Sequence, residues 1–152
     1  MEPVIVSLSQ SLTVVGRAVR TSHHDHSRLP VSPIRELWSR YLCDDFPSQI
    51  ARGGERIYGV YHEFENGWEG AYTVVAGMDN VPAYDTETQV QLQPGRYLVF
   101  SCKGEKETAS YGCWDAAWRY FEQGDCPHTR RFATDFEQYL PDDTVELYIS
   151  VE

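Results

Sequence analysis

The chain contains an internal repeat, in which a strand pattern, a helical pattern and a hairpin pattern occur twice in the same order. Gly16-Arg17, near the start of the first copy, recurs 79 positions later as Gly95-Arg96. Trp38 in the first helical segment recurs 80 positions later as Trp118 in the second. A nearly constant offset of this kind predicts two copies of one β-α-β-β unit.

The two copies span about residues 12–78 and 95–152, and we expect the whole chain, 1–152, to form a single domain. The expected fold class is α+β. Two units paired about a pseudo-two-fold axis form one antiparallel sheet, an SHS2-like arrangement, with two helices on one face and a central ligand cleft at the axis. Tyr58 and Glu137 are 79 positions apart, so we expect a ring in one half to correspond to a carboxylate in the other.

Hydrophobic periodicity predicts where the strands and helices lie. Alternating or β-branched runs predict strands at Val4–Leu8, Leu12–Val19, Arg56–Phe64, Ala71–Met78, Thr88–Leu92, Arg96–Cys102, Asp135–Leu140 and Thr144–Val151. Amphipathic spacing predicts one helix that begins after Ser32 and stops before Phe46-Pro47, and another over about Tyr111–Gln123. Lys103–Ser110 is predicted to be a polar connector.

The composition restricts partners and compartment. With 23 acidic and 13 basic residues the formal net charge is −10, which argues against direct binding to a nucleic-acid backbone and suits a cationic ligand or a basic protein partner. No apolar run reaches the roughly 18 residues that span a membrane, and no signal peptide is recognisable at the start of the chain. We therefore expect a cytoplasmic location without membrane association.

A polar loop contains three histidines within four residues, His23, His24 and His26. Imidazole is the commonest transition-metal ligand, which makes this loop a candidate metal site. Neighbouring loop histidines more often face solvent independently, and the four cysteines show no metal-finger spacing to accompany them. We therefore expect neither a metal nor a cofactor.

The last predicted strand pair, on either side of a turn at Pro141-Asp142-Asp143, places carboxylates beside phenols. Because strand side chains alternate between faces, Glu137 shares a face with Tyr139. Glu146 likewise shares a face with Tyr148 on the next strand. Carboxylates among aromatic rings are unusual in a half-buried sheet, so this hairpin is the candidate site.

Several segments in this order resemble a known family. They are PGRYLVF at 94–100, WDAAW at 114–118, DFEQYLP at 135–141 and ELYISV at 146–151. Together with the duplicated unit, they are similar to the gyrase-inhibitor-like (GyrI-like) effector-binding domain. This domain forms the ligand-sensing half of AraC-type and MerR-type multidrug regulators and also occurs alone. Too few residues precede Leu12 for a DNA-binding domain, so the resemblance is to the standalone form.

The resemblance implies that hydrophobic or amphipathic cations bind in a central pocket built from aromatic rings and a buried glutamate. The F-E-x-Y strand of the family matches residues 136–139, which assigns the acidic role first to Glu137. Its closing E-x-Y-I strand matches residues 146–149, which makes Glu146 the second candidate and Tyr148 the accompanying ring. Other candidate walls are the aromatic residues Tyr58, Tyr61, Trp68, Tyr72, Phe100 and Trp114.

The chemistry of such a pocket supports the same ligand class independently. A carboxylate surrounded by rings is desolvated, which raises its pKa unless a cation pairs with it. A lipophilic cation supplies that charge, and each aromatic face adds a cation–π attraction of about 0.5–2 kcal/mol. Ser150 stands where the family usually has Pro, so the choice between Glu137 and Glu146 stays open at this point.

Three functions are compared. The leading one is a standalone effector-binding module of the transcription-regulator type for cationic, drug-like molecules. The second is a GyrI-like hydrolase of strained electrophiles, in which Glu137 acts as general base with Trp68 or Trp114. The third is an acidic interaction module for a basic partner such as a gyrase. No nucleophile motif or phosphate-binding loop is present, so an enzyme is the less favoured reading and no catalytic residue is assigned.

Overall fold

The computed structural model describes residues 2–22 and 32–152, so His23, His24 and His26 lie outside the described residues. The strands in chain order are β1 (Val4–Leu8), β2 (Leu12–Ser22), β3 (Ile57–His62), β4 (Ala71–Met78), β5 (Thr88–Leu92), β6 (Gly95–Lys103), β7 (Thr134–Leu140) and β8 (Thr144–Val151). The helical elements are α2 (Pro33–Arg40), η1 (Tyr41–Asp45), α3 (Phe46–Ala51) and α4 (Lys106–Glu122).

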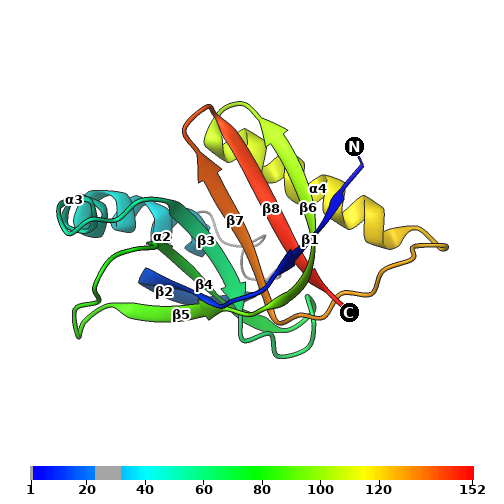
Figure 1. The fold of residues 1–152 in the computed structure, drawn as a ribbon, viewed down its shortest axis with the longest axis horizontal. Helices are drawn as coiled ribbons and strands as arrows, with labels where there is room; N and C mark the ends of the chain where they lie inside the picture. The colour runs from blue at the N-terminus through cyan, green and yellow to red at the C-terminus, as the bar shows by residue number, and fades with distance from the viewer. Residues whose placement is uncertain (1, 23–31) are drawn as a thin grey trace.

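All eight strands form one antiparallel sheet with the order β1-β6-β8-β7-β3-β4-β2-β5. The order reads symmetrically outward from the central β7–β3 pair, so each half contains a β-α-β-β unit and the halves join edge to edge. Figure 1 shows the helices of both halves behind this curled sheet. The predicted α+β fold, with a duplicated unit and the helices of both halves on one face of the sheet, is confirmed.

The two edge strands are exchanged between the halves. β1 precedes the first unit in the chain but pairs with β6 of the second, where Leu8 lies opposite Gly95. β5 precedes the second unit but pairs with β2 of the first, where Leu92 lies opposite Leu12. The outermost strand of each half is therefore one that adjoins the other half along the chain. Periodicity predicted both strands without indicating this exchange.

The first helix continues past the predicted stop before Phe46-Pro47, and this prediction was wrong. A π-helical turn, η1, follows α2, and the amide of Phe46 donates to the carbonyl of Tyr41 five residues earlier. The wider turn places Pro47 in the first turn of α3, where a missing amide hydrogen costs no helical bond. Proline therefore begins a new helical segment here.

The second helix begins five residues before the predicted Tyr111, so Lys103–Ser110 is only in part a connector. The first turn of α4 consists of exposed polar residues, among them Lys106, Glu107 and Thr108. Amphipathic spacing starts only where the helix contacts the sheet, at Ala109 and Cys113, which are buried. Periodicity detects a helix by its buried face, and it therefore missed a turn that has none.

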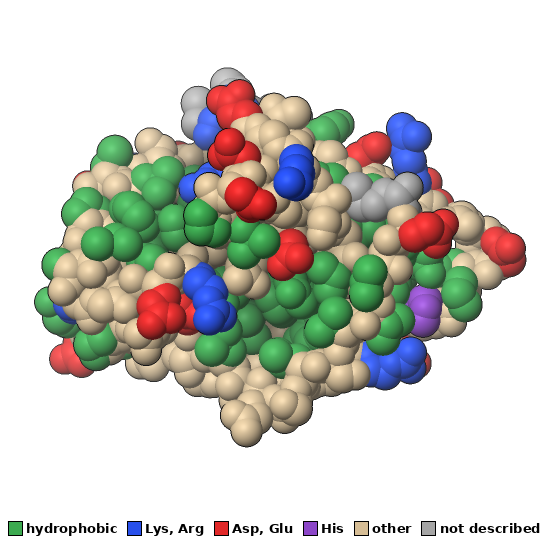
Figure 2. All heavy atoms as spheres, turned by 45° about the horizontal axis from the view of Figure 1, so that its top comes forward, with side chains coloured by type: hydrophobic (Ala, Val, Ile, Leu, Met, Phe, Trp, Pro, Cys, Tyr) green, Lys and Arg blue, Asp and Glu red, His purple; other side chains and the backbone are tan. Residues whose placement is uncertain are grey.

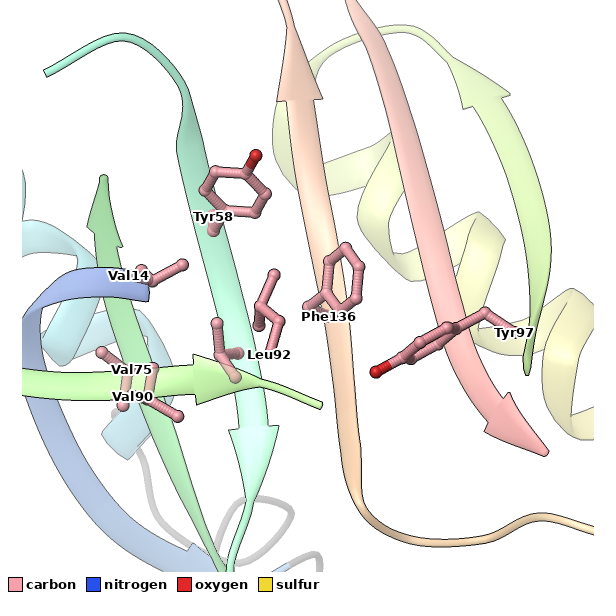
Figure 3. Packing of buried hydrophobic residues seen from close by; sticks show 8 residues of the cluster. Val14, Tyr58, Val75, Val90, Leu92, Tyr97 and Phe136 are labelled. Atoms are coloured by element: carbon pink, nitrogen blue, oxygen red, sulfur yellow. The ribbon is translucent and has the colours of Figure 1, made fainter. Parts of the chain in front are cut away.

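The sheet has a different core on each face. On the helix-covered face, α2 packs on β3 and β4 around Leu37, Tyr61 and Val74, while α4 packs on β6 and β8 around Phe100 and Leu147. The opposite face curls and packs against itself. Figure 3 shows this second cluster, which consists of Val14, Tyr58, Val60, Val75, Val90, Leu92, Tyr97 and Phe136.

Candidate functional site

The central β3–β7 pair carries a buried carboxylate on the helix-covered face. Glu137 lies opposite Gly59 of β3 and Leu147 of β8, and only 1% of its surface is exposed. Because Gly59 has no side chain, a residue of α2 can pack on the sheet directly beside the carboxylate. A Cβ at this glycine would lie 3.5 Å from Glu137 Oε1 and 3.0 Å from Cζ2 of Trp38.

Hydroxyl groups from β3 and α4 donate hydrogen bonds to this carboxylate. The Tyr61 hydroxyl donates to Oε1 at 2.9 Å, and the Ser110 hydroxyl donates to Oε2 in a short hydrogen bond. No lysine or arginine pairs with Glu137 anywhere in residues 2–22 and 32–152. The carboxylate is thus partly solvated by neutral donors and has no counter-ion.

Burial raises the pKa of Glu137 above its ordinary value, and the hydroxyl groups of Ser110, Tyr61 and Tyr139 together with the nearby Trp114 indole oppose that rise. Burial together with the charge of Glu137 also raises the pKa of Tyr61 well above 10, so this phenol stays a donor. The indole Nε1 of Trp114 is buried near the carboxylate and forms no hydrogen bond of good geometry. The site therefore stabilises negative charge incompletely.

Aromatic rings from both halves surround the carboxylate. The ring of Trp114 on α4 meets Tyr61 edge-on at 4.9 Å between centroids, and Tyr72 of β4 lies 6.1 Å from Tyr61. Trp38 on α2 meets Tyr139 of β7 edge-on at 5.2 Å. The two halves thus form an aromatic enclosure, which we define as Trp38, Tyr61, Tyr72, Trp114 and Tyr139, around Glu137.

Three of the residues predicted for the site lie on the opposite face of the sheet. Glu146 and Tyr148 point to the side where Tyr148 stacks on Phe136 at 4.4 Å, and the two glutamates are therefore separated by the sheet. Tyr58 pairs with Gln138, one position out of phase with Glu137, so it too points away from the carboxylate. The predicted correspondence of Tyr58 with Glu137 is wrong, because antiparallel register puts them on opposite faces.

Phe100 and Trp68 are also apart from the aromatic enclosure. Phe100 is fully buried beneath α4, where its ring meets Tyr120 at 5.8 Å. Trp68 lies on the β3–β4 hairpin with 53% of its surface exposed. Of the predicted site residues, the structure thus brings together Glu137, Tyr61, Tyr72 and Trp114.

Sequence reasoning missed three members of the site. Tyr139 shares a strand face with Glu137, a signal that was visible in the alternation pattern. Trp38 falls on the amphipathic stripe of its helix and was indistinguishable from a core residue. Ser110 carried no signal, because it was placed in a connector that proved to be helical.

One cavity, of about 420 Å³, lies away from the enclosure and is lined by Leu12, Thr13, Glu55, Arg56, Asp79, Asn80 and Val81. Next to the enclosure lies a cavity of about 40 Å³, between Lys106 and Tyr139. The expected position of the ligand cleft is thus filled by the rings themselves. No group of three or more His, Cys, Asp or Glu in the described part of the chain is arranged to hold a metal ion.

Comparison with known families gives one match over almost the whole chain. The model of the Cass2 family, described as integron-associated effector binding protein, matches residues 5–151. The chain belongs to this family. The resemblance to gyrase-inhibitor-like effector-binding domains is thereby confirmed, and the Cass2 family membership makes small-molecule binding the general activity of the fold. A comparison with curated proteins finds no significant match.

Solved structures share the fold of this chain over nearly its whole length. An integron cassette protein from the mobile metagenome of Vibrio cholerae is 28% identical, with a TM-score of 0.88 over 99% of this chain and 96% of that one. SAV2435, solved bound to tetraphenylphosphonium, is 19% identical, with a TM-score of 0.79 over 100% and 94%. A putative transcription regulation protein from Staphylococcus aureus MU50 is also 19% identical, with a TM-score of 0.76 over 100% and 99%.

Within the described residues of this Cass2 family member, no helix is both long and apolar enough to cross a membrane. The acidic side chains do not gather into one patch on the face shown in Figure 2, where they are spread among apolar and basic ones. This view identifies no interface for a basic protein partner, and that hypothesis stays a prediction.

Proposed function

We propose that this Cass2 family member binds lipophilic monocations with delocalised charge, and that Glu137 is their counter-ion within the aromatic enclosure. The observation that carries the proposal is a carboxylate that is 1% exposed and has no cationic partner in the described residues. Removing a carboxylate from water without a counter-ion is strongly unfavourable. An unpaired buried carboxylate is therefore expected where a bound ligand supplies the positive charge.

A second buried acid on the same strand provides an internal comparison. Asp135 is fully buried, and it accepts from the guanidinium of Arg130 at 2.7 Å and from the amide of Ser150 at 2.8 Å. This carboxylate has its cation and its donors within the chain and holds the connector against β8. Glu137, two residues later on the same face, has donors but no cation. The difference favours a binding role for Glu137.

The rings suit the charge and size of such a ligand. Aromatic faces attract a diffuse cation by about 0.5–2 kcal/mol each and place few directional demands on it. The structure of SAV2435 contains tetraphenylphosphonium, which is a ligand of this class. A drug-sized ligand needs a pocket of about 300 Å³ or more, so binding must displace rings of the enclosure from the carboxylate.

The test is a titration of the protein with tetraphenylphosphonium and with a rhodamine, followed by calorimetry and fluorescence. We expect micromolar or tighter binding by the wild type, and a loss of about tenfold or more in Glu137→Gln, since one buried charge pair contributes at least about 1.5 kcal/mol. Triphenylphosphine oxide, which is neutral, serves as the ligand control and should bind both proteins equally.

Glu146→Gln is the matched protein control, because it removes the same charge from the opposite face of the same hairpin. It should leave the affinity within about twofold of the wild type, because Glu146 is a half-buried charge that the sheet separates from the aromatic enclosure. Equal losses in the two variants would show a general effect of net charge. Undiminished binding by Glu137→Gln would refute the counter-ion role.

Two finer roles stay predictions. A hydrolase is favoured by one observation, the unpartnered Trp114 Nε1 beside a carboxyl group whose pKa is raised by burial. Turnover of a cyclopropane electrophile that is lost in Glu137→Ala would establish it. Delivery of the ligand signal to a transcriptional partner requires a change of surface on binding, which hydrogen exchange with and without tetraphenylphosphonium would detect.

A further inference from the structure

A lysine lies at the outer edge of the aromatic enclosure. Lys106 is the first residue of α4, and its Nζ is 5.1 Å from the centroid of the Tyr139 ring. The same lysine and the same ring line the 40 Å³ cavity beside the enclosure. One face of a ring that a cationic ligand would use is therefore already in contact with a cation.

The position of this lysine is not explained by helix stability. The amino-terminal end of a helix carries partial positive charge, so a cation in the first turn is unfavourable by a few tenths of a kcal/mol or more. No carboxylate within the described residues forms an ion pair with Lys106, whereas its neighbour Glu107 pairs with Arg35 of α2. Lys106 is exposed as a residue, but partial desolvation beside the Tyr139 ring lowers its pKa, which is a further cost to its charged form.

The lysine is connected to the carboxylate through Tyr139. The ring of Tyr139 contacts Lys106 on one side, and its hydroxyl is directed toward Glu137, where it helps to lower the pKa of that carboxyl group. A cation bound between Glu137 and this ring thus has Lys106 as a like-charged neighbour across a single aromatic ring. The ammonium group of Lys106 and the ligand cation therefore both interact with the Tyr139 ring and repel each other.

We propose that Lys106 is a specificity-determining residue of this site, which restricts its ligands to monocations and excludes aromatic dications. The inference rests on the proposed function of Glu137. One carboxylate neutralises the first positive charge of a ligand, and the repulsion from Lys106 acts on every charge that the ligand carries. Asp143 also lines the small cavity, but no carboxylate of the described residues forms an ion pair with Lys106, so a second positive charge near the mouth meets an unpaired lysine.

The effect scales with ligand charge, which makes it measurable. At a separation of about 10 Å in a medium of intermediate dielectric constant, one like charge changes affinity by about fivefold. Removing Lys106 should therefore strengthen binding by about fivefold for a monocation and by about 25-fold for a dication, with no change for a neutral ligand.

The experiment compares wild type with Lys106→Met and uses two phosphonium probes that share their aryl groups. Benzyltriphenylphosphonium is the monocation, and para-xylylenebis(triphenylphosphonium) is the corresponding dication. Dividing the variant's affinity by that of the wild type for each probe cancels the difference in size. We expect the gain for the dication to exceed the gain for the monocation about fivefold, and both gains to shrink in high salt.

Lys103→Met is the matched control, because Lys103 is an exposed lysine on the preceding strand and its loss changes net charge equally. It should alter neither affinity by more than about twofold. Lys106→Arg keeps the charge and should discriminate as the wild type does. Equal gains for the two probes in Lys106→Met, or the same gains in Lys103→Met, overturn the role of Lys106 while leaving the proposed function intact. If the wild type binds neither phosphonium, both proposals fail.

Discussion

Burial and hydrogen bonding act in opposite directions on the carboxyl group of Glu137. Burial is the larger effect and raises its pKa, while Ser110 and Tyr61 are the strongest of the donors that lower it. The folded state therefore favours the protonated form more than the unfolded state does. Stability from this group is complete below the ordinary pKa of 4.5 and is lost as the pH rises through the raised pKa.

Glu137→Gln should accordingly be more stable than the wild type at alkaline pH, by about 1–3 kcal/mol, since the neutral amide avoids the cost of an incompletely paired buried charge. Near pH 4, where the wild-type carboxyl is protonated, the two proteins should differ little. Urea denaturation between pH 4 and pH 8 measures the difference. Parallel stability curves for the two proteins would contradict the raised pKa.

The same proton links binding to pH. A cation favours the ionised carboxylate, so ligand affinity should increase with pH until the pKa of the free protein is passed. A substitution that stabilises the protein and weakens ligand binding is the expected trade-off at a functional site.

The elements position the site through the register of β3 against β7. Their pairing places Gly59 directly beside Glu137, and α2 places Trp38 above that glycine. The absence of a side chain at Gly59 is what allows an indole from one half to approach the carboxylate of the other. The close approach is a matter of packing, because Gly59 has ordinary backbone angles.

Two glycine-to-alanine substitutions should therefore have opposite effects on stability. Gly59→Ala introduces a Cβ 3.0 Å from Trp38, and overpacking of this kind should destabilise the protein by about 1–3 kcal/mol. Gly112→Ala lies within α4, where the new Cβ would be 3.8 Å from the Cys102 sulfur. Alanine should stabilise this helix by about 0.5–1 kcal/mol.

Thermal and urea denaturation of both variants provide the measurement, with Trp fluorescence reporting any movement of Trp38. A neutral effect of Gly59→Ala on stability and on fluorescence would show that Trp38 is not confined above the glycine.

The whole molecule is held together by the exchange of β1 and β5. Each edge strand is adjacent to one half along the chain and hydrogen-bonded to the other half. The central β3–β7 pair joins the halves directly. Such a half-barrel has no boundary along which one copy of the repeat separates intact. The two copies should therefore fold and unfold as one cooperative unit.

Native-state hydrogen exchange tests this cooperativity. Amides of β2 and of β6, one from each half, should exchange through openings of equal free energy. Removal of residues 2–8 should lower both values together, by about 1–3 kcal/mol, because it uncovers apolar side chains of β6. A loss confined to the second half would show that the halves open independently.

The sequence alone determined the strands, the duplication and the hairpin that carries the buried carboxylate, with Glu137 as the first of two candidates. Alternation paired Glu137 with Tyr139 on one face, and the repeat placed that strand near the axis of the molecule. These are local properties: strand side chains alternate with a period of two residues, and the repeat is a recurring order of elements along the chain.

Only the tertiary structure decided which aromatic residues surround the carboxylate. A shift of one residue in register exchanges the faces of a strand, so the constant offset misplaced Tyr58, and the separation of Glu146 from Glu137 depended on the same register. The exchange of edge strands, the π-turn before Pro47 and the position of Lys106 over Tyr139 likewise depend on contacts between distant segments. Pairing across the sheet and packing of helices on it fixed these features, and no local pattern encodes either.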